Sequence, residues 1–341
     1  MKFKVGVVAF CIATMSSVSA QEKIEIPKGK VMGKVFFNYH LDATKGAQQT
    51  SAFELTRAYL GYVYKINDKF SATVVLDAGK SSGGSDHSVF VKNAKLTYKA
   101  ESWLTFSAGI IGMKQFKAQE KFWGYRYLYK SLADEYKFGT SADLGVLAAI
   151  KVNDYFKMDL LLVNGEGYKN VQDASGNTRF GANFVYTPTE NWIFKTYVDA
   201  MKEIDIADVT KTTIITNVAV FAGYTIKSKF RIGAEYNLLK NGTSYKEASE
   251  NKELKGLSFY ATYILNSKWN LFGRYDQLSS NTLMGAMNDW NHSKDGTTMI
   301  TGLEYTPTKG VKTSVNYRFT DFEDGSNKNR SLLYMNLEFF F

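Results

Sequence analysis

The sequence predicts an all-β fold, a transmembrane antiparallel β-barrel of about sixteen strands, on three observations. Apolar and polar residues alternate with a period of two along most of the chain, which is the pattern of strands with one apolar face. The connections between these segments are alternately short and long, as in outer-membrane barrels. Aromatic residues recur beside the short connections, as at a membrane interface.

The amino terminus has the pattern of a secretory signal peptide. Lys2 and Lys4 precede an apolar run at 5–12, and small residues end at Ala20. We therefore expect a signal peptide at 1–20 and a barrel at 21–341. No run of 18 or more apolar residues follows, so strands rather than helices are expected to cross the membrane.

Composition narrows the chemistry. The chain has 42 Lys plus Arg against 33 Asp plus Glu, and removal of Lys2 and Lys4 leaves 40 against 33, a formal charge of +7. Export makes nucleic acid an improbable partner for this charge. The three His and single Cys of the whole chain argue against zinc or thiol chemistry, so no cofactor or metal is expected.

Sixteen alternating segments follow one another from residue 30 to the end. Near the carboxyl end, for example, Val311, Val315 and Phe319 share one face while Lys312 and Arg318 lie on the other. The segments centre on Phe36, Ala58, Val74, Ala94, Phe106, Val146, Leu160, Gly181, Thr196, Val220, Ile232, Phe259, Leu271, Thr301, Val315 and Met335. No convincing helical periodicity interrupts them.

Seven short turns and eight long loops connect these segments. The turns hold residues such as Asn67-Asp68 and Asn266-Ser267, whereas the loops are rich in Gly, Asn, Ser, Asp and Lys. The predicted loops are 42–51, 80–88, 114–139, 164–177, 201–211, 240–254, 279–296 and 320–330. Short turns on the periplasmic side and long loops on the cell surface are typical of an outer-membrane barrel.

Aromatic residues open six of the seven strands that follow a short turn. These are Phe70, Trp103, Phe156, Trp192, Phe230 and Trp269. A soluble β-sandwich would also have many short strands, but it would scatter its aromatic residues through the core. The pattern therefore favours a membrane barrel in contact with lipid and lipopolysaccharide.

The last strand ends in an alternating apolar face. Leu337, Phe339 and Phe341 share it, and this ending resembles the carboxy-terminal signal that the barrel-assembly machinery reads in outer-membrane proteins. We expect these residues to serve as an assembly signal. The protein is accordingly expected in the outer membrane of a Gram-negative bacterium.

The third long loop is expected to fold inward. Its residues 114–139 include eight aromatic residues, an apolar load that water would not leave exposed. Sixteen strands enclose a lumen that side chains alone do not fill, so this loop would narrow the pore. Cations at a constriction favour anions, and the candidates in the loop are Lys114, Lys117, Lys121, Arg126 and Lys130. The alternative is that the loop covers the outside with its charges solvated.

Alternation also assigns charged residues to the lumen, because a Lys or Arg facing lipid at the midplane would cost roughly 2–4 kcal/mol. Ten cations and seven acids fall on that face, a mixed wall with a mild basic excess. The candidate pore-lining cations are Lys34, Arg57, Lys95, Arg179, Lys195, Arg231, Arg274 and Arg318. The assignment of Arg57 requires a β-bulge near Thr56, since the alternation before and after that residue disagrees.

Short motifs resemble the phosphate-selective porin O and P family. They are FELTRAYLGYVYKIND (53–68), VKNAKLTY (91–98), LTFSAGIIGMKQF (104–116), SADLGV (141–146), LLLVNGEG (160–167) and GRYDQ (273–277). The resemblance spans nearly the whole exported chain. It implies a sixteen-stranded trimeric porin with an inward-folded loop and an affinity for phosphate. The mixed wall fits a general or weakly anion-preferring pore better than a strictly phosphate-selective one.

These observations predict a porin, a passive diffusion channel for small hydrophilic solutes with a mild preference for anions. The alternative is a structural or adhesive barrel whose surface loops bind partners without selective transport. An enzyme is not expected, because His40, His87 and His292 are the only histidines and no nucleophile with a base is evident. Two groups of loop acids, Asp321, Glu323 and Asp324 in one loop and Asp289 and Asp295 in another, lack the spacing of a recognised calcium loop.

Overall fold

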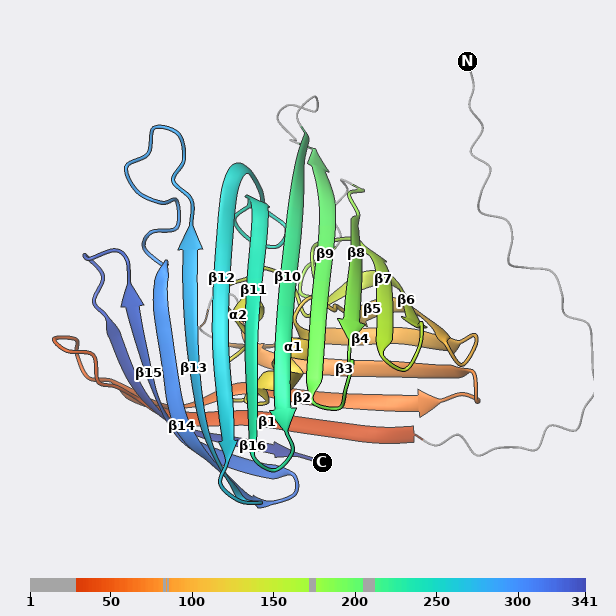
Figure 1. Cartoon of the computed structure of the whole chain (residues 1–341), viewed down its shortest axis with the longest axis horizontal. Coiled ribbons are helices and arrows are strands. Elements are labelled where there is room, and N and C mark those ends of the chain that lie inside the picture. Colours follow the sequence, from red (N-terminus) through yellow and green to blue (C-terminus); the bar gives the residue numbers. More distant parts are fainter. Residues whose placement is uncertain (1–28, 82–83, 85, 172–175, 205–211) are drawn as a thin grey trace, which may run out of the picture.

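The computed structural model describes residues 29–81, 84, 86–171, 176–204 and 212–341. Within them, sixteen antiparallel strands close into one barrel (Figure 1). The strands are β1 (Gly29–Asp42), β2 (Ser51–Lys65), β3 (Phe70–Lys80), β4 (His87–Lys99), β5 (Leu104–Gly112), β6 (Ala142–Lys151), β7 (Phe156–Val163), β8 (Arg179–Tyr186), β9 (Trp192–Ile204), β10 (Thr212–Ile226), β11 (Phe230–Gly242), β12 (Ala248–Ile264), β13 (Trp269–Ser280), β14 (Gly296–Thr308), β15 (Val311–Phe322) and β16 (Arg330–Phe340). The predicted sixteen-stranded barrel is confirmed.

Each strand pairs with its neighbours in sequence, and β1 pairs with β16 to close the sheet. In that closing pair Val35 lies opposite Phe339 and Phe37 opposite Leu337. Every predicted strand centre falls inside one of the sixteen strands. Short turns gather at one end of the barrel and longer loops at the other (Figure 1), as alternating connection lengths predict.

The predicted loop at 240–254 is wrong in its bounds. Strand β11 continues to Gly242 and β12 begins at Ala248, so the connection is 243–247. The upper part of this hairpin, including Glu250 and Lys252, has no apolar face because it extends beyond the membrane, where water contacts both sides of the strands. A polar strand of this kind cannot be told from a loop by alternation.

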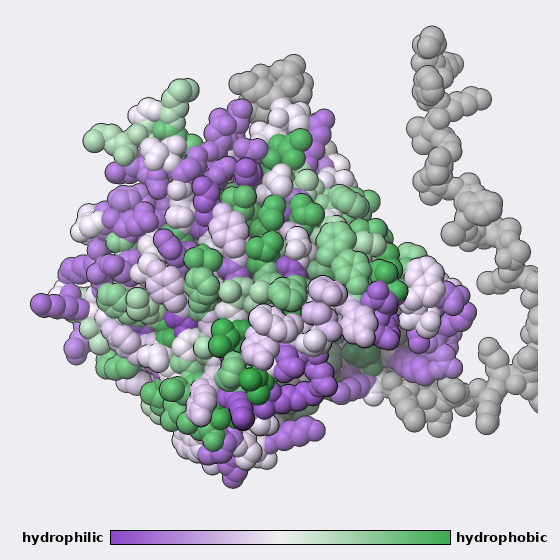
Figure 2. Space-filling view, in the orientation of Figure 1, coloured by the Kyte–Doolittle hydropathy of each residue, from purple (hydrophilic) through white to green (hydrophobic). Residues whose placement is uncertain are grey.

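The outer face of the barrel is apolar. Val146, Phe180 and Phe259 are each about half exposed on it, and Figure 2 shows hydrophobic side chains gathered across the strands with hydrophilic ones around the loops. A closed barrel leaves no unpaired strand edge, which is the condition for crossing a membrane with strands. An apolar exterior on such a barrel makes this an outer-membrane protein.

Aromatic side chains meet in pairs at the end of the barrel that carries the short turns. Phe70 stacks on Tyr98 with ring centroids 4.7 Å apart, and Trp269 stacks on Tyr305 at 4.4 Å. Trp192 lies 4.6 Å from the ring of Tyr224. These rings form the predicted belt, placed where amphipathic aromatics favour the headgroup region.

The barrel wall differs in height around its circumference. Strands β5, β6, β7 and β8 have 9, 10, 8 and 8 residues, whereas β12 has 17. On the low side the inner face carries apolar residues, and Leu147 and Leu161 are buried there with Ile111. On this side of the barrel, apolar side chains such as Tyr245 therefore cover the lumen-facing surface of the short strands.

Two short helices, which the sequence did not reveal, lie in the third loop. They are α1 (Lys117–Trp123) and α2 (Leu132–Glu135), of seven and four residues. One or two turns are too short to display a helical period. Neither has the length and apolar character needed to cross a membrane. The predicted signal peptide at 1–20 lies outside the described residues.

Candidate permeation pathway

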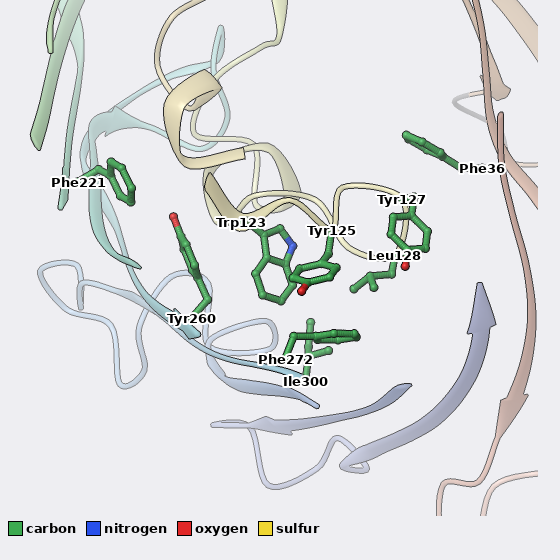
Figure 3. Close-up of a cluster of buried hydrophobic side chains, with 9 residues drawn as sticks. All are labelled: Phe36, Trp123, Tyr125, Tyr127, Leu128, Phe221, Tyr260, Phe272 and Ile300. Carbon is green, nitrogen blue, oxygen red and sulfur yellow. The ribbon is translucent and has the colours of Figure 1, made fainter. Parts of the chain in front are cut away.

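The third loop, residues 113–141 between β5 and β6, folds into the lumen and packs against the opposite wall. Figure 3 shows Trp123 and Tyr125 of this loop between Tyr260 and Phe272 of the barrel. The rings of Tyr125 and Phe272 lie 4.4 Å apart, and both loop residues are 1% exposed. The predicted inward fold is confirmed, and burial of the aromatic side chains accounts for it.

A second apolar cluster holds the remainder of the loop nearer the cell surface. Phe116, Leu132 and Phe138 pack there against Leu239 and Leu254 of the wall. Most wall residues of the two clusters belong to β9 to β14. Open space remains beside β1 to β4, where Lys34, Tyr59 and Lys92 border it.

Four wall cations fasten the third loop by donating hydrogen bonds to its backbone carbonyls. Arg231 donates to the carbonyl of Trp123 at 2.9 Å, and Arg274 donates to that of Lys130 at 2.7 Å. Lys195 donates to Gln115 and Arg318 to Leu128. An irregular loop leaves carbonyls unpaired, and buried carbonyls need donors.

These four residues were predicted from alternation to line the pore, and they do face the lumen. Lys195, Arg274 and Arg318 are each less than a tenth exposed because the loop covers them. Arg231 also borders open space on the periplasmic side of the loop. Lys195, Arg274 and Arg318 thus point at the third loop and do not border open water.

Two further loops are fastened inside the barrel. Arg179, fully buried, binds Asp199 at 2.5 Å and the carbonyl of Tyr245 at 2.5 Å, so it holds the loop 243–247. Its guanidinium also lies 4.0 Å from the ring of Tyr245. On the loop after β7, Tyr168 donates to Asp77 at 2.6 Å. The cell-surface entrance is therefore narrowed by three loops of the described chain.

Two basic chambers lie in the remaining space. The outer chamber, about 510 Å³, is lined by the cations Arg57, Lys92, Arg126, Lys130, Lys137, Lys169 and Lys246 and the acids Asp134, Glu166 and Glu247. The inner chamber, about 760 Å³, is lined by the cations Lys34, Lys92, Lys117, Lys121, Arg126, Arg231 and Lys312 and the acids Glu120 and Glu338. In each chamber cations outnumber acids by more than two to one, which makes the potential positive.

Lys92 and Arg126 border both chambers and mark the junction between them. Lys92 Nζ lies 3.4 Å from the hydroxyl of Tyr59 and 3.6 Å from a carboxylate oxygen of Asp77. Arg57 binds the other oxygen of Asp77 at 3.0 Å. Two cations and the Tyr168 hydroxyl therefore share one carboxylate, and the wall side of the junction keeps a positive charge.

Arg126 provides the loop side of the junction. Its guanidinium lies 3.2 Å from Glu120 and 3.3 Å from Asp134, one acid on each short helix. These contacts hold the pKa of Asp134 below its usual value against the raising effect of burial, with Arg126 the main cause of the lowering. The loop thus presents a guanidinium that is oriented by two carboxylates.

Two β-bulges aim the wall cations at this junction. The pairing of β1 with β2 shifts so that Thr56 has no partner, which confirms the predicted bulge and places Arg57 on the lumen side. The pairing of β3 with β4 shifts in the same way at Lys92. Sequence analysis missed Lys92, although Val91 and Leu96 lie at positions of opposite parity and this disagreement could have revealed the bulge.

The other predicted constriction residues are distributed along the pathway. Lys117 lies 3.5 Å from Glu120 and Lys121 also faces the inner chamber, whereas Lys130 lies in the outer chamber, 3.7 Å from Glu135. Lys114 lies 3.1 Å from Asp159 and borders neither chamber.

The predicted wall residues Lys34 and Lys95 lie on β1 and β4. Lys34 borders the inner chamber 3.6 Å from Glu338. Lys95, opposite Gly109 in the pairing of β4 with β5, shares its parity with lumen-facing Asn93 but lies outside the two chambers. Leu337 and Phe339, which were predicted with Phe341 to form an assembly signal, lie on the outward parity of β16. Phe341 follows the strand and continues the pairing with Gly33.

The histidines and several loop acids make contacts with residues of neighbouring strands and loops. His40 contacts Asn38 at 3.1 Å, His87 contacts the carbonyl of Leu55 at 3.3 Å, and His292 lies 3.9 Å from Glu323. The structure also brings together the carboxylates of Asp289, Asp295 and Glu323, which lie within 4.8 Å of one another. Spacing in the sequence did not indicate this. Asp295 accepts hydrogen bonds from Ser280 and Asn291 and thereby orders its loop.

Comparison with known proteins places this architecture among outer-membrane channels. No protein-family model and no curated protein matches the chain. Among solved structures, the outer membrane channel DcaP of Acinetobacter baumannii is similar with a TM-score of 0.70 and 13% identity, over 92% of this chain and 97% of DcaP. OmpF of Salmonella typhi has a TM-score of 0.69 and 15% identity, over 92% and 97%. An anion-selective porin from Comamonas acidovorans has a TM-score of 0.64 and 10% identity, over 92% and 100%. The chain has the fold of the outer-membrane porins.

Proposed function

We propose that this protein is an outer-membrane porin, a passive diffusion channel for small hydrophilic solutes with a mild preference for anions. The observation that carries the proposal is the junction of two basic chambers at Lys92 and Arg126. A narrow passage between low-dielectric walls strengthens the field of fixed charges, so cations there attract anions and oppose cations. The similarity to an anion-selective porin agrees with this assignment.

Phosphate is proposed as one permeant anion among several. The motifs shared with the phosphate-selective porin O and P family favour phosphate. Acids also lie along the pathway, however, and Asp77, Glu120 and Asp134 each accept a contact from one of the junction cations. These local contacts offset the charge of the junction cations, which weakens binding and allows an ion to leave, as conduction requires.

We also propose the remaining parts of the assembly. Residues 1–20 would act as a signal peptide, and Leu337, Phe339 and Phe341 would be read by the barrel-assembly machinery. The folded barrel would form a homotrimer among lipid and lipopolysaccharide. OmpT, an outer membrane protein of Vibrio cholerae with a TM-score of 0.60 and 16% identity, has a solved trimer form. No enzymatic activity is proposed.

Ion conductance in planar bilayers tests the function. In a KCl gradient the wild-type reversal potential should indicate preference for chloride, and phosphate added on one side should reduce the chloride current. Replacing Lys92 and Arg126 by Glu should move the reversal potential toward potassium, because each change alters the local charge by two units. The matched control is Lys229→Glu with Lys268→Glu, two exposed turn lysines outside both chambers. A folded protein without conductance would support the alternative of a structural or adhesive barrel.

A further inference from the structure

A side groove of about 540 Å³ opens from the inner chamber along β1, β2 and β3. It shares Lys34, Tyr59, Val75 and Phe340 with the chamber lining, so a solute in the chamber has access to it. Its surface is much more apolar than that of either chamber. The proposed diffusion of hydrophilic solutes gives no reason for an apolar groove beside the pathway.

The floor of the groove is a glycine between two apolar side chains. Gly61 pairs with Met32 on one side and with Val75 on the other. A Cβ at Gly61 would lie 3.1 Å from the Met32 Cε and 3.2 Å from a Val75 methyl carbon. The absence of a side chain at Gly61 therefore keeps the groove open, and Met32 and Val75 form its sides.

Cations border this apolar surface. Lys30, Lys34 and Lys309 contribute to the lining, and none of the other lining residues is acidic. Lys34 Nζ lies 5.6 Å from the ring of Phe340, and its side chain is 45% exposed. Glu338 lies 3.6 Å from Lys34 but belongs to the lining of the chamber and not of the groove. The groove thus combines an apolar floor with a positive rim.

We propose that the groove selects small organic anions with an apolar body, such as aromatic carboxylates, from among the anions that enter the pathway. This inference rests on the proposed porin function and specifies the solute class. The carboxylate of such a solute would remain beside the lysines while its body displaces water from Met32, Gly61 and Val75. Removal of apolar surface from water is favourable in proportion to its area. Chloride and phosphate have no apolar surface and gain nothing from this lining.

Block of chloride current in planar bilayers tests the proposal. Benzoate should reduce the single-channel chloride current at a concentration at least threefold lower than acetate does, at neutral pH where both are fully ionised. Benzylammonium, with a similar body and the opposite charge, should have no such effect. Equal block by benzoate and acetate would overturn the inference. Loss of chloride preference itself would instead contradict the proposed porin function, so the two failures are distinct.

An isosteric variant locates the effect in the groove. Met32→Gln retains the size of a side chain that belongs to the groove and to neither chamber, and it removes the apolar character of that side chain. Its advantage for benzoate over acetate should fall, while its chloride-to-potassium preference remains that of the wild type. The control is Val185→Thr, another apolar-to-polar change on the lumen parity of β8, outside the groove. An unchanged benzoate advantage in Met32→Gln, with normal conductance, would refute the assignment.

Discussion

The hydroxyl of Tyr168 donates a 2.6 Å hydrogen bond to Asp77, which joins residues 91 positions apart across the lumen. Asp77 is fully buried and also accepts from Arg57. The nearby carboxylate raises the pKa of Tyr168, after burial the second cause of the increase, so the hydroxyl remains a donor at neutral pH. The loop after β7 is therefore held by Asp77, the residue that also offsets the charges of Arg57 and Lys92 at the junction.

Removal of this tie should loosen the outer entrance. In Tyr168→Phe the loop loses a hydrogen bond to a charged group, a contribution of about 1.5–3 kcal/mol. We expect a noisier single-channel current and faster proteolysis of the loop after β7, with the barrel still folded. Tyr155→Phe, in an exposed turn at the other end, is the control. A quiet channel and a protected loop in Tyr168→Phe would show that the hydrogen bond does not hold the loop.

Asp77 should limit the anion preference. The variant Asp77→Asn keeps the shape of the side chain and leaves Arg57 and Lys92 without their shared counter-charge. The reversal potential in a KCl gradient should therefore shift further toward chloride, and the shift should decrease as salt screens the charges. Asp321→Asn, an equal change of charge on an exposed residue, should leave it unchanged. A shift toward potassium in Asp77→Asn would contradict this account of the junction.

We expect Arg318 to contribute to the stability of the third loop and not to the ion current. It donates to the carbonyl of Leu128 and lies 3.8 Å from the ring of Tyr334, without an acidic partner in its described contacts. Arg318→Gln should lower the thermal unfolding temperature of the detergent-solubilised barrel by several degrees, because a buried carbonyl loses its donor. Arg330→Gln, at an exposed position of the next strand, is the matched control. Equal unfolding temperatures for the two variants would show that Arg318 does not fasten the loop.

The acidic group at the cell-surface end should make the loops there sensitive to pH. Partial burial, followed by the charges of Asp295 and Asp289, raises the pKa of Glu323 above 4.5. An acid with a raised pKa in the folded state contributes stability below its unfolded pKa, and this is lost as the pH rises through the folded value. The protection factors of the amides in the loop 281–295, which are corrected for the intrinsic pH dependence of hydrogen exchange, should therefore be higher near pH 4 than near pH 7. Glu323→Gln should remove this difference, and a persistent difference would assign it to another group.

The barrel itself could be predicted from the sequence because its strands obey one rule. Residues such as Phe259 and Val146 face lipid, where a polar side chain is unfavourable, so alternation is strict wherever the strand is in the membrane. The same rule predicted the bulge at Thr56, since one extra residue in a strand reverses the parity of every residue after it. Above the membrane the rule does not apply, and the ends of β11 and β12 were missed.

The pathway could be predicted only in part. Alternation indicates on which side of the sheet a side chain lies, but it does not indicate which group that side chain contacts. It placed Arg231, Arg274 and Arg318 on the lumen side, but a contact with a loop carbonyl depends on how 29 residues of loop fold within the barrel, at 113–141. Arg126 and Lys130 were both predicted at the constriction, without any indication that Arg126 borders both chambers and Lys130 only the outer one. The clustering of Asp289, Asp295 and Glu323 joins two loops and has no local signature.

The basic residues of the lumen have two different roles, which a count of charges does not distinguish. Some hold the third loop in place, and others border the open pathway. Lys195, Arg274 and Arg318 are committed to backbone carbonyls, and these carbonyls are present whatever the side chains of the loop. Lys92, Lys121 and Lys130 border open water and have no carbonyl to support. Substitution of Lys92, Lys121 or Lys130 in the course of evolution could therefore change which solutes pass. The position of the third loop, which Lys195, Arg274 and Arg318 hold, would remain the same.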